Sequence, residues 1–245
     1  QPFDRAYHVA LCISGEVRDL STLQCFIDQQ VIPFTLNGST CDIFLHCSFR
    51  DQMIKSKYLE RLRPKIVIER RVNSNNLSRV VFGRIYELHQ IVKSYESTIS
   101  RRKYDLYIRT RPDIVLSKPL SSNDLRNAMA GKLCCTMILS SLYVLTSKRF
   151  ISDTFFVANE TAMDQLVKIY EYIQSENITC SNPEALLYNY IKTLNITTYY
   201  VEPEISLSDY IMQSSKKNNI IKMFSKFRDL PLLDLSGCKI TTSNT

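Results

Sequence analysis

Apolar residues in this chain gather into short runs separated by polar turns, a pattern typical of buried strands in an α/β protein. The run YHVALCIS at residues 7–14 is almost continuously apolar and ends at Gly15, which predicts a central parallel strand. Residues 132–139 and 141–146 are expected to form a smaller second sheet. The remaining runs predict strands at residues 42–47, 65–69, 106–108, 114–116, 151–158 and 197–202.

Between the runs, apolar residues recur at intervals of three and four, which places them on one face of a helix. Residues 77–99 show this spacing best, with Val81, Ile85, Leu88 and Val92 in register. They predict one long helix packed on the sheet. Shorter helices are expected at residues 20–32, 53–62, 121–126, 159–174 and 182–194.

The alternation of strands and helices predicts one α/β domain with a mainly parallel central sheet flanked by helices. Five glycines among 245 residues are few for a sandwich or barrel with many tight turns. We expect the domain to occupy residues 1–208. Residues 209–245 have a looser, basic amphipathic pattern. They are expected to form a C-terminal extension, a helix packed on the domain or, as the alternative, a helix on a membrane surface.

Composition narrows the classes of partner. Hydrophobic residues make up 44% and charged residues 22% of the chain, as in globular proteins, and the net charge is +7. The positive charge suits an anionic ligand. Lysines and arginines are spread along the chain rather than clustered, which argues against nucleic acid. The longest apolar window, residues 133–145, is too short and too polar to span a bilayer.

The eight cysteines include no Cys-x-x-Cys pair and have no histidine at zinc-ligand spacing. Several lie within apolar runs, so we expect buried free thiols in a reducing compartment and a cytoplasmic protein. The chain begins with Gln1 rather than Met. A leader or anchor before this residue, and with it a secretory lumen, is therefore the alternative.

The chemistry is concentrated in the stretch YDLYIRTRPDIVL at residues 104–116. A short buried strand gives way to Arg109, Arg111 and Asp113, and Pro112 forces a turn because it has no N–H for a sheet ladder. Arginine forks match phosphate oxygens, and a carboxylate can hold Mg²⁺ or Mn²⁺ on a diphosphate. The alternative is a surface turn in which arginine and aspartate pair with each other.

A second candidate lies at the first strand, where Gly15 and Arg18 precede a helix. A glycine turn lets a ligand approach the backbone, and the N–H groups that open a helix attract anions; an ordinary strand-to-helix loop is the alternative. Open parallel sheets bind ligands at the carboxyl ends of their strands. We therefore expect Gly15, Arg18, Arg109, Arg111 and Asp113 to converge there.

Five segments in the same order resemble a GT-A-type glycosyltransferase-like family of bacteria and large DNA viruses such as the chloroviruses. The resemblance covers roughly residues 9–201. It implies a GT-A-like domain that holds a nucleotide-sugar donor across the strand ends, and, in a chlorovirus setting, a viral protein. The segments are ALCISGEVRDL, CDIFLH, YDLYIRTRPDI, DTFFVANETAMDQLVKIY and NPEALLYNYI.

The resemblance also implies a divalent cation, Mn²⁺ or Mg²⁺, at an acidic motif after the fourth strand. The usual Asp-x-Asp is here Arg111-Pro112-Asp113, so only Asp113 is matched as a metal ligand, and the arginines could take over part of the charge neutralisation. The late histidine that often completes such a site is absent, because the three histidines all precede the fourth strand. They are expected to be packing or capping residues: His8, His46 and His89.

The expected activity is transfer of a hexosyl or pentosyl group from a nucleoside diphosphate sugar to a glycan hydroxyl. A UDP-sugar is the favoured donor, with UDP-xylose as one candidate. An inverting transfer needs a carboxylate base, for which Glu184 at a helix start is preferred over Asp153 near the start of a strand. Helix-dipole stabilisation would explain Glu184 without chemistry. The alternative functions are a catalytically inactive nucleotide-sugar-binding domain and a nucleic-acid-binding α/β module.

Overall fold

The computed structural model describes residues 3–36, 38–70, 76–116, 119–137, 151–180, 182–201 and 204–206. The expected extension at residues 209–245 and the expected strand at residues 141–146 lie outside this part of the chain.

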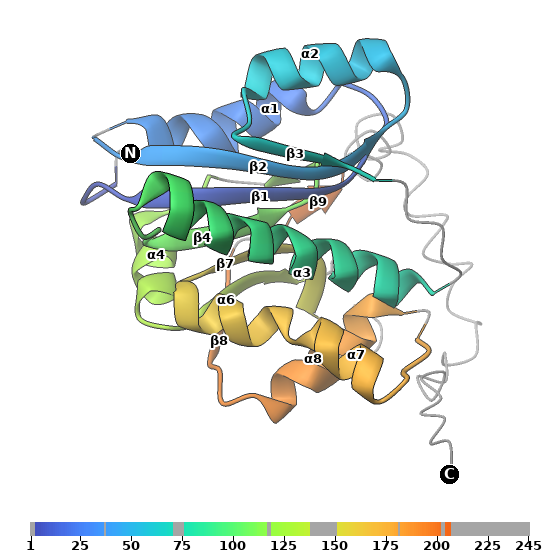
Figure 1. The fold of residues 1–245 in the computed structure, drawn as a ribbon. Coiled ribbons are helices and arrows are strands. Elements are labelled where there is room, and N and C mark those ends of the chain that lie inside the picture. The colour runs from blue at the N-terminus through green and yellow to red at the C-terminus, as the bar shows by residue number, and fades with distance from the viewer. Residues whose placement is uncertain are drawn as a thin grey trace, which may run out of the picture.

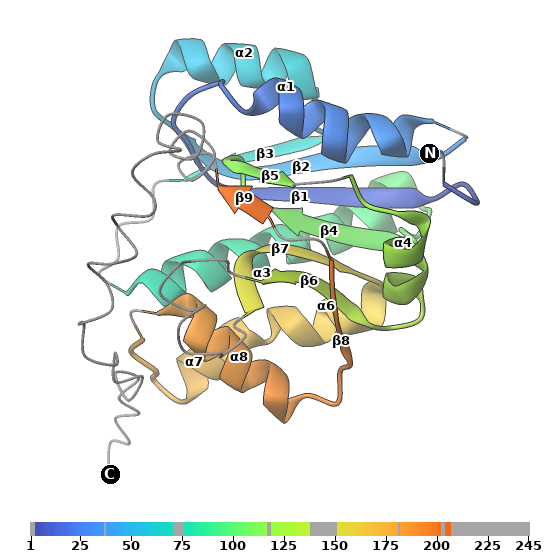
Figure 2. The ribbon, with the colours of Figure 1, turned by 180° about the vertical axis from the view of Figure 1, so that it is seen from behind.

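Within the described residues, seven strands form the main sheet: β1 (His8–Val17), β2 (Thr40–Phe49), β3 (Ile66–Glu69), β4 (Leu106–Thr110), β6 (Leu133–Met137), β7 (Ile151–Ala158) and β8 (Thr198–Tyr200). They lie in the order β3-β2-β1-β4-β7-β6-β8 (Figures 1 and 2). The first four run parallel, β7 is antiparallel to both of its neighbours, and β8 is parallel to β6. This arrangement confirms the predicted single α/β domain with a mainly parallel central sheet.

Helices cover both faces of the sheet (Figures 1 and 2). One face, called here the α3 face, carries α3 (Leu77–Tyr95), α6 (Glu160–Val167), α7 (Ile169–Ser175) and α8 (Pro183–Thr193). The opposite face, called the α2 face, carries α1 (Leu23–Phe26), the turns η1 (Ile27–Val31) and η2 (Ile32–Thr35), α2 (Gln52–Leu62) and α4 (Ser122–Met129). Each face buries its own apolar cluster, so the β1 strand between them reads as a continuous apolar run.

The helix starts follow from side-chain caps that the sequence contains. Asn159 and Asn182 each accept a hydrogen bond from the backbone N–H three residues later, which opens α6 and α8. Pro183 occupies the first position of α8, where its missing N–H costs nothing. Ser121 and Asp124 form a reciprocal capping box at the start of α4.

Three expected helices are interrupted. The one expected at residues 159–174 divides into α6 and α7 at Lys168. The segment expected to be one helix up to residue 32 breaks into α1, a π turn and a 3-10 turn, where Pro33 cannot donate to a helical carbonyl. The long helix expected at residues 77–99 ends as α-helix at Tyr95 and continues as the π turn η3 (Glu96–Ser100).

A small second sheet exists, but it is built from other residues than expected. It pairs β5 (Ile114–Leu116) with β9 (Glu204–Ser206) in antiparallel fashion. The segment expected at residues 132–139 instead forms β6 inside the main sheet, between β7 and β8. An apolar run indicates that a strand is buried but does not indicate which strand lies next to it. The sequence pattern therefore assigned this segment to the wrong sheet.

The thiol prediction holds for most of the described cysteines. Cys12, Cys47 and Cys134 are buried free thiols whose pKa is raised to about 12 by burial. Cys180 is disulfide-bonded, which corrects the expectation of a free thiol at that position. None of the helices in the described part of the chain is long and apolar enough to cross a membrane.

Candidate active site at the carboxyl edge of the sheet

The carboxyl edge is defined here as the side of the sheet where β1, β2, β3 and β4 end; the antiparallel strand β7 starts there. Gly15 lies inside β1, which continues to Val17, and does not end the strand as expected. Its φ of +151° disfavours other residues, and a Cβ at this position would lie 2.9 Å from Cδ of Pro112. The glycine therefore lets the turn after β4 pack directly against β1.

Arg111 and Asp113 form a bidentate ion pair across this turn. Nε and Nη2 of Arg111 donate to the two carboxylate oxygens of Asp113 at 2.9 and 2.7 Å. The side chains are 37% and 42% exposed. This is the arginine–aspartate pair that we considered as the alternative to a phosphate site. Because exposed pairs contribute only about 0–1 kcal/mol, an anionic ligand can compete for the Arg111 fork.

Arg109 is placed quite differently. It is 4% exposed, its Nη1 donates to the main-chain oxygen of Asp153, and its Nη2 makes a long hydrogen bond of 3.5 Å to Oγ of Ser14. Arg109 and Arg111 therefore contact different partners, whereas we expected both to point at one ligand. The strand ends at Thr110, so Arg109 lies within the sheet and Arg111 lies on the turn that follows it.

Arg18 follows the last residue of β1 and is an exposed side chain. Its Nε donates to Oε2 of Glu16 at 2.8 Å, and its side chain is 73% exposed. Such a surface pair leaves the guanidinium available to an anion that approaches the carboxyl edge.

The two candidate bases come from different elements. Asp153 is the third residue of β7 and is 3% exposed. Glu184 is the second residue of α8, as the sequence predicts. The segment before α8 is held to the start of α3, because Asn76 and Ser78 donate to the carbonyls of Ile178 and Cys180.

Polar side chains that sequence reasoning missed hold the turn and β5 in place. Thr22 donates its hydroxyl to the carbonyl of Pro112 at 3.2 Å. Gln29 makes two hydrogen bonds to the backbone of Leu116, and Gln30 donates to the carbonyl of Ile114. The sequence signal that could have indicated these contacts was Gln30, a polar residue on an otherwise apolar helical face. It is buried in the structure, and a buried amide needs a hydrogen-bond partner.

No group of three or more His, Cys, Asp or Glu side chains in the described residues is arranged to hold a metal ion. The three histidines are buried and bonded to protein groups, as expected for packing residues. Nε2 of His46 lies 2.9 Å from Glu87, Nε2 of His89 lies 2.6 Å from Asp164, and Nδ1 of His8 lies 3.2 Å from the carbonyl of Lys103.

No family model matches this chain, and no curated protein matches it. Among solved structures it is similar to a protein from Desulfovibrio desulfuricans G20 described as a candidate nucleotide-diphospho-sugar transferase. The two share 10% sequence identity, the similarity covers 86% of this chain and 90% of the other, and the TM-score is 0.48. This likeness supports neither UDP, manganese nor a viral origin, which stay expectations.

Proposed function

We propose that this chain is a glycosyltransferase that moves a sugar from a nucleoside diphosphate donor to a glycan hydroxyl. The observation that carries the proposal is the junction of β1 and β4 at the carboxyl edge. There Gly15 admits close approach, and Arg18, Arg111 and Asp113 lie at the ends of two adjacent parallel strands. Open α/β sheets bind ligands at this place.

The exposed arginines would stabilise the leaving diphosphate. Arg111 offers a planar fork that matches two phosphate oxygens, and Arg18 adds a second positive charge. When a phosphate oxygen replaces Asp113 as the acceptor for Arg111, the carboxylate of Asp113 becomes available to a cation. The donor proposed is a UDP-sugar, with UDP-xylose among the candidates, and the transfer is inverting.

The residues fit a divalent cation in one mode only. Mg²⁺ is often held by one or two carboxylates together with substrate phosphate oxygens and water. Asp113 would supply the one carboxylate, and the bound cation would neutralise charge on the diphosphate. A site made of protein ligands alone is not available among the described residues.

The same pair favours one alternative function. A single carboxylate that is already paired with Arg111 is also what a binding domain without catalysis would show. Release of nucleoside diphosphate from a nucleotide sugar, measured with and without Mn²⁺, separates the two functions.

Asp113→Asn tests the assignment of the cation. The substitution removes the metal ligand and the ion pair of Arg111 with Asp113, so UDP affinity without metal should be equal or higher. The gain in affinity from Mn²⁺, expected to be about tenfold or ~1.4 kcal/mol, should disappear. Calorimetric titration of UDP with and without Mn²⁺ measures both.

Asp28→Asn is the matched control, because Asp28 is an exposed carboxylate that accepts a hydrogen bond from Gln24 on the α2 face. It should keep the metal-dependent gain. An unchanged gain in Asp113→Asn would remove the metal from this turn.

A further inference from the structure

Asp153 combines deep burial with a carboxylate that has no partner among the described residues. The residue is 3% exposed, and no hydrogen bond or ion pair to its side chain is found in the described part of the chain. An unpaired buried carboxylate costs stability, and such exceptions concentrate at functional sites.

The backbone around Asp153 departs from regular pairing. Cys135 pairs with Phe156, but the next pair joins Met137 to Ile151, so β6 advances by two residues while β7 advances by five. Asp153 lies within this bulge, at the carboxyl edge. Bulges next to active sites re-aim a side chain at the cost of ladder hydrogen bonds.

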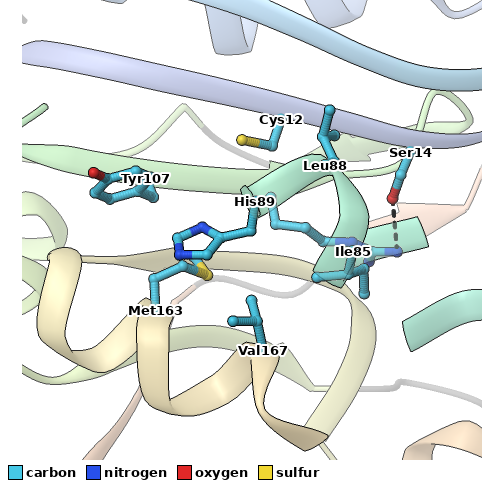
Figure 3. Close-up of a pocket in the computed structure, with 9 residues that line it drawn as sticks. Cys12, Ser14, Ile85, Leu88, His89, Tyr107, Met163 and Val167 are labelled. Atoms are coloured by element: carbon cyan, nitrogen blue, oxygen red, sulfur yellow. Dashed lines mark hydrogen bonds between the residues drawn. The ribbon is translucent and has the colours of Figure 1, made fainter. Parts of the chain in front are cut away.

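Arg109 supplies the hydrogen bond that the interrupted ladder lacks. Its buried guanidinium donates to the carbonyl of Asp153 and reaches Ser14 on β1, a contact drawn as the dashed line in Figure 3. It also lies 5.9 Å from the ring centroid of Phe156. One side chain therefore connects β4 to the bulge of β7 and to β1.

The guanidinium has little room to move. The void beside it, on the α3 face, has a volume of about 10 Å³ and is lined by Cys12, His89, Met163 and Val167 among others (Figure 3). That is roughly the space of one water molecule. Arg109 therefore acts as a fixed brace.

We infer that Asp153 is the carboxylate base of the transfer and that Arg109 is its positioning residue. This inference rests on the proposed function. The carboxylate would take the proton of the acceptor hydroxyl while the hydroxyl oxygen forms a bond to the anomeric carbon. The bond from that carbon to the diphosphate breaks, and the diphosphate leaves with the electron pair. Glu184, preferred from the sequence, then only stabilises the start of α8.

Hydrogen exchange tests the brace without any assumption about activity. In Arg109→Met, the amides of residues 152–155 should exchange at least about tenfold faster than in the parent, because the bulge loses an anchor. The regular pairs at Val157 and Ala158 should change less. Arg126→Met is the matched control, since Arg126 bridges α4 to Asp4 on the exposed surface. If the amides of residues 152–155 exchanged no faster in Arg109→Met than in Arg126→Met, Arg109 would not be a brace.

Kinetics test the link to the base. Release of nucleoside diphosphate is measured with UDP-glucose, UDP-galactose, UDP-xylose and GDP-mannose, with Mn²⁺, for Asp153→Asn, Glu184→Gln, Arg109→Lys and Arg109→Met. Asp153→Asn should lower kcat by about 10²-fold to 10⁴-fold. The Arg109 variants should lower kcat while the donor KM stays within about twofold, because the arginine does not touch the donor.

Three results would overturn the inference. A raised donor KM with unchanged kcat in Arg109→Lys would make Arg109 a donor ligand, as first expected from the sequence. An inactive Glu184→Gln beside an active Asp153→Asn would make Glu184 the base. If both Arg109 variants kept the kcat of the parent, Arg109 would have no positioning role. If the parent cleaves none of these donors, the proposed function and the base fail together, and hydrogen exchange still decides whether Arg109 braces the bulge. Arg109→Lys keeps the charge and serves if Arg109→Met does not fold.

Discussion

At the scale of single residues, the carboxyl edge contains two arginines, two positions apart in the sequence, whose surroundings differ. Arg109 is the last but one residue of a buried strand and is fixed by protein groups, whereas Arg111 lies on the turn after that strand and its side chain is 37% exposed. A buried guanidinium loses its hydration and must be satisfied by protein acceptors, while an exposed one can exchange partners. Arg109 is thus suited to holding the backbone in place, and Arg111 is suited to binding a ligand.

Gly15→Ala should destabilise the domain more than Gly38→Ala does. Both glycines have positive φ, but a Cβ at Gly15 would lie 2.9 Å from Pro112, while one at Gly38 would have only ordinary contact with Ala6. The shared strain of positive φ costs roughly 1–2 kcal/mol, and the clash adds about 1–3 kcal/mol. Urea denaturation of the two variants isolates the clash. Equal losses would show that the turn yields easily to a larger side chain.

At the scale of elements, hydroxyl and carboxylate groups join β2, β4 and η3 at the edge opposite the carboxyl edge. Glu96 is buried and accepts from the backbone N–H of Tyr104 at 2.6 Å and from the hydroxyl of Tyr107 at 3.1 Å. The hydroxyl of Tyr104 donates to Asp42 on β2 at 2.8 Å. These contacts connect buried groups to charged acceptors, which makes them costly to break.

Stability should fall steeply in alkali. Burial and the nearby carboxylates raise the pKa of Tyr104 and Tyr107 in the folded protein. A raised folded pKa means that the stabilisation is complete below the unfolded pKa near 10 and is lost above it, at about 1.4 kcal/mol per pH unit for each group. The buried thiols of Cys12 and Cys47, with pKa about 12, act in the same direction. Urea denaturation from pH 8 to 11 measures the slope.

In Tyr107→Phe, the fall of the unfolding free energy with pH should be less steep, by the contribution of about one proton. The contribution of the buried thiols should remain. The variant loses the hydroxyl that donates to Glu96, so its stability at pH 8 should also be lower by about 1.5–3 kcal/mol. A slope identical to that of the parent would mean that Tyr107 titrates alike in the folded and the unfolded state, so that its pKa is not raised by folding.

At the scale of the whole molecule, positive charge and an open α/β sheet allow two kinds of anionic partner. A nucleotide sugar would bind at one place, the carboxyl edge, whereas nucleic acid would need phosphate contacts over a broad basic surface. Several basic side chains of the described surface are already paired with carboxylates: Lys55, Arg70, Lys93, Lys103 and Arg126. This pairing favours the small ligand.

A thermal-shift screen should therefore respond to a nucleotide sugar with Mn²⁺. A ligand present at about one hundred times its Kd adds roughly 2.7 kcal/mol to the folded state and raises Tm accordingly. Binding of duplex or single-stranded nucleic acid with a steep salt dependence, and no shift with any nucleotide sugar, would point to the nucleic-acid alternative.

The sequence by itself determined the alternation of elements and the helix caps at Asn159 and Asn182. It also placed Gly15 and Asp113 at one edge of the sheet, because the periodicity and the turn residues are local properties. The tertiary structure decided what depends on neighbours distant in the chain. It placed β6 in the main sheet, paired β5 with β9, and bulged β7 so that the carbonyl of Asp153 meets Arg109, which lies 44 positions away in the sequence. A pattern of apolar residues shows that a strand is buried, but only packing selects its neighbour and the partner of a buried charge.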